Sequence, residues 1–141
     1  MVIASLCDMV ARIRHITVDC KDAYALAQFW SALTGWPIEE ENAPGDTECL
    51  IAPMLPEPLD PSMPGMLFVQ VPEPKTVKNR MHLDLGPADH TRDVEVARLS
   101  ALGASVVADH RTAEGLGWVV MTDPEGNEFC IERSNAERAG T

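Results

Sequence analysis

The feature that most constrains the fold is a strand-and-helix pattern that occurs twice along the chain. Residues 12–19 and 80–86 both alternate apolar and polar side chains over part of their length, which predicts a β-strand with one apolar face. His15 and His82 occupy matching places on the polar faces of these two strands. The apolar positions are Ile16, Val18, Leu83 and Leu85, and the further polar positions are Thr17, Asp19 and Asp84.

An amphipathic helix is predicted after each opening strand. Asp22 and Thr91 are candidate N-caps, and Gly35 and Gly103 have the place of helix-ending residues. The apolar stripes are Leu26, Phe29, Trp30 and Leu33 in the first helix, and Val96, Leu99 and Leu102 in the second. From the histidine to the glycine is 20 residues in the first copy and 21 in the second. A duplicated unit is the economical explanation.

Three short strands are expected to complete each copy. They lie at 36–40, 48–52 and 66–71 in the first copy, and at 106–109, 116–122 and 128–132 in the second. Proline density makes residues 53–65 a loop and 72–75 a linker, and the sequence of residues 123–127 is typical of a turn.

The expected fold is α+β, with two tandem βαβββ modules that form a cup-shaped mixed sheet with the helices on its outer face. We expect residues 1–11 to be an N-terminal extension and 12–141 to be a single domain. Within that domain, module one is 12–74, module two is 75–133, and 134–141 is a C-terminal tail.

Polar side chains on the inner faces of the strands define a candidate site, because a half-buried polar group needs a partner. The cup-facing set is His15, Gln70, His82 and Cys130, with Thr17, Phe68, Asp84, Glu128 and Glu132 nearby. Trp118, beside Gly115 and Gly117, is a candidate to stack on a flat ligand. Imidazole is a common metal ligand, so two readings stay open: half-sites for a metal, or histidines satisfied by local hydrogen bonds.

Charge and cysteine usage exclude several classes of partner. The net charge is −11 and the isoelectric point about 4.6, which disfavours nucleic acid and anionic membranes. The cysteines Cys7, Cys20, Cys49 and Cys130 have no zinc-ribbon spacing. Reduced thiols and a cytoplasmic location are therefore expected.

The chain resembles the vicinal-oxygen-chelate superfamily of glyoxalase I, fosfomycin and bleomycin resistance proteins and extradiol dioxygenases. The resemblance lies in residues 14–19, 29–36, 80–85 and 123–129, and residues 71–82 look most like the uncharacterised glyoxalase-like branch. It implies paired βαβββ modules and a homodimer.

The same resemblance implies metal ligands on the first and last strands of each module. Carried over, the first-strand ligands fall on His15 and His82, whereas the last-strand positions hold Gln70 and Cys130 in place of glutamate. Glu132 shares the face of Cys130 but lies about 6.5 Å further along the strand. The cofactor expectation is therefore none, or one divalent metal among Zn, Ni, Fe and Mn.

Three functions remain open from the sequence. The first is a protein that binds a small organic molecule in the cup, without a complete catalytic metal site. The second is a metal-dependent lyase, isomerase or dioxygenase of the glyoxalase type, with Glu132 or Asp84 as the candidate catalytic base. The third is an interaction or regulatory domain without a ligand.

Overall fold

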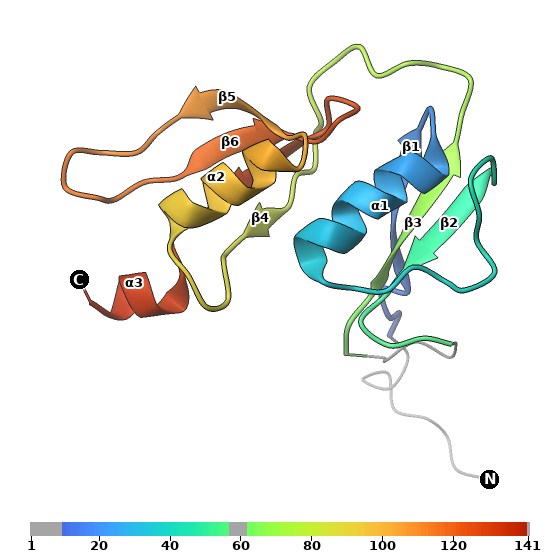
Figure 1. Cartoon of the computed structure of the whole chain (residues 1–141), viewed down its shortest axis with the longest axis horizontal. Coiled ribbons are helices and arrows are strands. Elements are labelled where there is room, and N and C mark those ends of the chain that lie inside the picture. Colours follow the sequence, from blue (N-terminus) through green and yellow to red (C-terminus); the bar gives the residue numbers. More distant parts are fainter. Residues whose placement is uncertain (1–9, 57–61, 141) are drawn as a thin grey trace, which may run out of the picture.

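The structure is a computed structural model that describes residues 10–56 and 62–140. Most of the predicted extension 1–11 lies outside these ranges. Two α/β units lie side by side, and the segment 71–83 connects them along one edge (Figure 1). None of the helices in the described ranges has the length and apolar character needed to cross a membrane.

Module one contains one helix and three strands. The strands are β1 (His15–Cys20), β2 (Glu48–Ile51) and β3 (Gly65–Gln70), in the order β1-β3-β2, and the helix is α1 (Ala23–Thr34). The carboxylate of Asp22 accepts a 3.1 Å hydrogen bond from the amide of Ala25, and Gly35 ends the helix at a φ of 76°. These two residues cap α1 as predicted.

Module two repeats this plan with one more strand. Its strands are β4 (Asp84–Leu85), β5 (Ser105–Asp109), β6 (Val119–Thr122) and β7 (Glu128–Ile131), in the order β4-β7-β6-β5, and its helix is α2 (Arg92–Ala101). In each module the opening strand runs parallel to the last strand, which gives the two units the same topology. The predicted α+β fold with two tandem modules is confirmed.

Two predicted strands are reduced to two residues or fewer. The strand at 36–40 is reduced to one bridge between Ile38 and Ile51, next to Pro37, whose ring nitrogen has no proton for a ladder. The strand at 80–86 is reduced to Asp84–Leu85. Residues 80–83 are part of the connection between the modules instead of a strand. The amide of Asn79 at the start of this stretch donates to the carboxylate of Glu128, which fixes the path of the connection.

The C-terminal tail contains a short helix. Helix α3 (Asn135–Ala139) begins with a capping box, in which the Ser134 hydroxyl accepts from the amide of Glu137 and the Glu137 carboxylate accepts from that of Ser134. The same carboxylate also accepts from the amide of Arg92 at 2.9 Å. Helix α3 is therefore attached to the start of α2.

The junction between the modules combines an aromatic cluster with a buried polar contact. The rings of Phe29 and Trp30 on α1 contact Phe129 on β7, with centroids 6.4 and 5.2 Å apart. The indole N–H of Trp30 donates to Asp123, which is 3% exposed in the turn before β7. Helix α1 therefore packs on its own sheet and also against the second module.

Two further contacts cross the junction at the ends of α1. The carboxylate of Glu125 accepts from the amides of Lys21 and Asp22, at 2.6 and 3.0 Å, just before α1 begins. At the other end, the guanidinium of Arg98 donates to two carbonyl oxygens of the last turn, at 2.9 and 3.0 Å. Both ends of α1 are thus held by module two.

Candidate functional site

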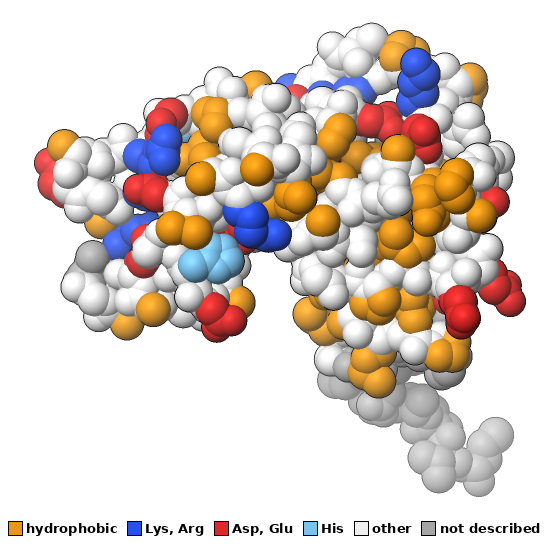
Figure 2. Space-filling view, in the orientation of Figure 1, with side chains coloured by type: hydrophobic (Ala, Val, Ile, Leu, Met, Phe, Trp, Pro, Cys, Tyr) orange, Lys and Arg blue, Asp and Glu red, His pale blue; other side chains and the backbone are white. Residues whose placement is uncertain are grey.

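A pocket of about 930 Å³ lies between the opening strand of module one and the connection to module two. Its walls are β1, residues 73–83, and the end of the turn that leads into β7. Trp30 and Phe129 from the junction also line it. Hydrophobic side chains gather over the module-one half of the molecule in Figure 2, where a notch separates the two halves on the side away from the connection.

Four of the predicted site residues line this pocket: His15, Thr17, His82 and Glu128. His15 and Thr17 come from β1, and His82 comes from the segment just before β4. The opening segments of the two modules therefore bring both histidines to one cavity. The pocket lies along β1, which is an edge strand of its sheet, and along the residues that precede the edge strand β4.

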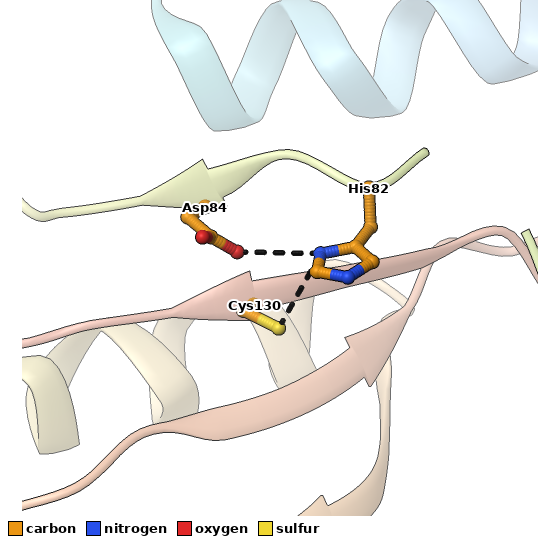
Figure 3. Close-up of side chains that lie close together, drawn as sticks. All are labelled: His82, Asp84 and Cys130. Atoms are coloured by element: carbon orange, nitrogen blue, oxygen red, sulfur yellow. Dashed lines mark hydrogen bonds and ion pairs between the residues drawn. The ribbon is translucent and has the colours of Figure 1, made fainter. Parts of the chain in front are cut away.

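A second group of predicted residues converges around His82 (Figure 3). Nδ1 of His82 lies 3.3 Å from a carboxylate oxygen of Asp84 and 4.0 Å from Sγ of Cys130. Asp84 and Cys130 are paired in register on the parallel strands β4 and β7, so their side chains share a face. One ligand atom from each of the three residues lies within 4.8 Å of the others.

The arrangement of this cluster argues against a thiolate nucleophile. Asp84 and Cys130 both approach Nδ1 of His82, whereas a relay needs the acid and the nucleophile on opposite ring nitrogens. Burial raises the pKa of the Cys130 thiol, and the carboxylates of Asp84 and Glu132 raise it further. Lys78 opposes this shift only as the last of the contributions. A neutral thiol is a weak nucleophile.

The donor set of the cluster fits a zinc ion. Zinc accepts imidazole nitrogen, thiolate sulfur and carboxylate oxygen, and three protein ligands leave a position for water or substrate. His82 also lines the pocket, so a metal bound by this cluster would lie at the edge of the pocket.

The predicted face of Phe68 and Gln70 is wrong. In the register of β1 and β3, Phe68 pairs with Val18 and shares its face, whereas Thr17 pairs with Leu67. Phe68 is fully buried in the core, and Gln70 is exposed and does not line the pocket. The residue of module one that corresponds to Cys130 is therefore Leu67, which cannot bind a metal.

Two other predicted residues lie away from the pocket. The Trp118 ring stacks on His110, with centroids 4.7 Å apart, at the far side of the four-stranded sheet. Glu132 forms an ion pair with Arg138 at 2.8 Å. A carboxylate engaged in this way is less available as a base than one directed into the pocket.

Sequence reasoning missed the connection as a wall of the pocket. Residues 74–83 contain Lys75, Lys78 and Arg80 and no acidic residue, in a chain with twice as many acidic as basic side chains. Lys75 binds Glu128 at 2.9 Å. The amide of Asn79 and the Lys75 ammonium hold the pKa of Glu128 below its usual value, although burial opposes this. The run of basic residues was the available signal.

The duplicated modules place the chain in a glyoxalase-like class of protein. The chain belongs to the glyoxalase-like domain family, whose model matches residues 15–132. Comparison with curated proteins gave no match.

Solved structures with the same fold have little sequence identity to this chain. A fosfomycin resistance protein, FosX, from Listeria monocytogenes, solved as a point mutant with Mn(II) and 1S,2S-dihydroxypropylphosphonic acid, is 15% identical. That match covers 92% of this chain and 95% of the other, with a TM-score of 0.64. A glyoxalase/bleomycin resistance protein/dioxygenase family enzyme from Burkholderia phytofirmans is 20% identical over 86% and 97%, with a TM-score of 0.61. These similarities show the fold.

Proposed function

We propose that this protein binds a small organic molecule in the pocket between β1 and the connection. The observation that carries the proposal is a cavity of about 930 Å³ that both His15 and His82 line. This volume is within the range of small-molecule sites, about 300–1,000 Å³. Apolar side chains form much of the wall, and the polar side chains among them would orient the ligand.

The two histidines supply directional contacts in this proposal. A neutral imidazole offers one donor and one acceptor, so His15 and His82 together can fix two polar atoms of a ligand. Thr17 adds a hydroxyl on the same strand as His15. Trp30 and Phe129 offer aromatic surface for an apolar body.

Ligand-dependent stabilisation tests this proposal. A panel of small acids, amines and neutral ring compounds is screened for a rise in the melting temperature, which follows mass action when only the folded state binds. His15→Ala and His82→Ala should each abolish the rise given by a hit. His110→Ala is the matched control, because His110 lies outside the pocket and stacks on Trp118. A rise that persists in both pocket variants would refute the proposal.

The second candidate function is a divalent-metal-dependent lyase, isomerase or dioxygenase of the glyoxalase type. The observation that favours it is the cluster of His82, Asp84 and Cys130. In that function these residues would hold the metal, which would polarise substrate oxygens as a Lewis acid. If Asp84 is a metal ligand, it could not also serve as the catalytic base. Glu132 could serve as that base only after its ion pair with Arg138 is broken.

Elemental analysis separates the two candidates. Purified protein reconstituted with zinc, nickel, iron or manganese should hold a stoichiometric amount of one of them if the second function is correct. Asp84→Asn and Cys130→Ala should lose it, and His110→Ala should not. His15→Ala tests whether the first-module histidine contributes, because His15 lies in the same pocket but not in the cluster. Metal far below stoichiometric after reconstitution would exclude the second function.

We also propose a cytoplasmic homodimer. Three cysteines in the described ranges, Cys20, Cys49 and Cys130, are free thiols, in keeping with a reducing compartment. The edge strands β1 and β4 offer backbone groups to a second copy. Light scattering tests the dimer, and a monomer at micromolar concentration would refute it. Cell fractionation tests the location.

A further inference from the structure

We propose that the pocket selects an organic anion with an apolar body, with Lys78 and Arg80 binding its acidic group. This inference rests on the proposed function and names the class of ligand. Two independent features of the pocket carry it: cations on the connection that have no acidic partner among the described residues, and exposed apolar side chains beside them.

The cations are unusual in this chain. The net charge is −11, yet the connection supplies Lys75, Lys78 and Arg80 to the lining of one pocket. Lys75 is neutralised by Glu128. Lys78 and Arg80 form no ion pair with any residue in the described ranges 10–56 and 62–140. Two positive charges therefore remain available to a ligand.

The pocket is also lined by four acidic residues, Asp19, Glu73, Asp123 and Glu128, and none of them forms an ion pair with Lys78 or Arg80 in the described ranges. Asp123 and Glu128 are already engaged, with Trp30 and Lys75 respectively. Asp19 and Glu73 also line a neighbouring hollow beside Cys20, whereas Lys78 and Arg80 do not. Asp19 lies four residues along β1 from His15, about 13 Å in an extended strand. Among the described residues, neither Asp19 nor Glu73 forms an ion pair with Lys78 or Arg80.

The apolar feature is a group of exposed side chains on the same lining. Ile13, Val77 and Met81 are 72%, 76% and 89% exposed, and all three line the pocket. Large apolar side chains grouped at this exposure are typical of a binding surface. Val77 and Met81 flank Lys78 and Arg80 along the connection, so one ligand would meet both kinds of contact.

A matched pair of fluorescent probes tests the proposal on the full chain. 8-Anilinonaphthalene-1-sulfonate carries an anionic group on a ring system, and N-phenyl-1-naphthylamine is the same ring system without the sulfonate. Wild-type protein should bind the sulfonate at least about tenfold more tightly than the neutral probe, as expected for a charge-assisted contact. The double variant Lys78→Gln, Arg80→Gln should remove that preference and leave the affinity for the neutral probe unchanged.

Control variants locate the effect. Lys21→Gln and Arg12→Gln make the same changes of charge outside the pocket lining and should preserve the preference. Met81→Gln should lower the affinity for both probes by the same factor, because it removes an apolar contact and leaves Lys78 and Arg80 in place. Circular dichroism confirms that each variant is folded.

The remaining outcomes each overturn a stated part of the proposal. Equal affinity for the two probes, or a preference that survives Lys78→Gln, Arg80→Gln, would refute anion selection and leave the pocket as a binding site. Failure to bind either probe would refute the proposed function as well. If Met81→Gln changed a dimer into a monomer without affecting either probe, the apolar rim would belong to a second copy, and the proposal would fall.

Discussion

The indole N–H of Trp30 donates a 3.0 Å hydrogen bond to the carboxylate of Asp123, which lies 93 residues later in the chain. The same carboxylate accepts from the amides of Glu125 and Asn127 and from the Asn127 side chain. One buried acidic group thus orders the turn before β7 and joins it to helix α1. The stability of the two-module unit should depend on it.

Replacing Asp123 should be strongly destabilising. Asp123→Ala leaves several buried donors without an acceptor, including the Trp30 indole, and should lower the free energy of unfolding by about 3 kcal/mol. Urea unfolding followed by tryptophan fluorescence measures the change. Asp89→Ala, at an exposed position, is the control and should stay within about 0.5 kcal/mol of wild type. Equal stability of the two variants would contradict the role of Asp123.

Two glycines in one loop should respond differently to the same substitution. Both have left-handed backbones, with φ of 83° at Gly115 and 88° at Gly117. A Cβ at Gly115 meets nothing within 4 Å, whereas at Gly117 it would lie 1.9 Å from the carbonyl oxygen of His110. Gly115→Ala should cost about 1 kcal/mol of stability through backbone strain alone, and Gly117→Ala about 3 kcal/mol or more. Thermal unfolding of the pair measures the difference, and similar melting temperatures would contradict this geometry.

Stability should fall in alkaline solution because of Cys20. Burial raises the pKa of this thiol from 9.0 to about 12, with smaller contributions from the charges of Glu125, Asp22 and Asp19. The folded state therefore keeps a proton that the unfolded state loses, so the stabilisation is complete below pH 9 and is lost as the pH rises towards 12.

The measurement is the free energy of unfolding in urea between about pH 8 and pH 11 for wild type and Cys20→Ala. Above about pH 9 the wild-type value should fall more steeply, by up to about 1.4 kcal/mol per pH unit for one proton. Other groups titrate in both proteins, so the difference between the slopes isolates Cys20. Parallel slopes would show that the folded thiol ionises as readily as the unfolded one.

The second candidate function predicts zinc binding that strengthens with pH. Burial and the neighbouring carboxylates raise the pKa of Cys130, so binding must displace a proton from the thiol. Affinity should rise about tenfold per pH unit while the thiol is protonated. Competition with a chromophoric zinc indicator at about pH 6.5 and pH 8 measures this for wild type and Cys130→Ser. A dependence on pH that is unchanged in Cys130→Ser would place zinc elsewhere.

Local signals in the sequence were sufficient to predict helices α1 and α2 and the duplication. Asp22 and Gly35 cap α1 through contacts within four residues, so residue type and spacing determine where that helix starts and stops. The two modules have the same topology because the sequence contains two copies of one strand-and-helix pattern.

The faces of β3 could not be predicted in this way. Leu67, Phe68 and Val69 are consecutive apolar residues, so alternation alone does not say which of them meets the helix. The choice is made by pairing with β1, which aligns Phe68 with Val18. This register depends on residues about 50 positions apart in the sequence.

The candidate site was only partly predictable for the same reason. His82 and Asp84 were expected on one face of the same strand, but the approach of Cys130 to them depends on the parallel pairing of β4 with β7. Lys78 lies between the predicted linker 72–75 and the predicted strand 80–86, and Arg80 is the first residue of that strand. Only the path of this segment along the pocket gives the two charges a place in the site.

Module two binds both ends of α1, and this has a consequence for folding during synthesis. Residues 23–34 leave the ribosome long before Arg98, Asp123 and Glu125 are made. Until then Phe29 and Trp30 lack the Phe129 ring that covers them in the finished protein. The nascent first half therefore carries an uncovered aromatic surface, the kind of surface that chaperones bind. Its release from such a chaperone would coincide with the arrival of the last strand.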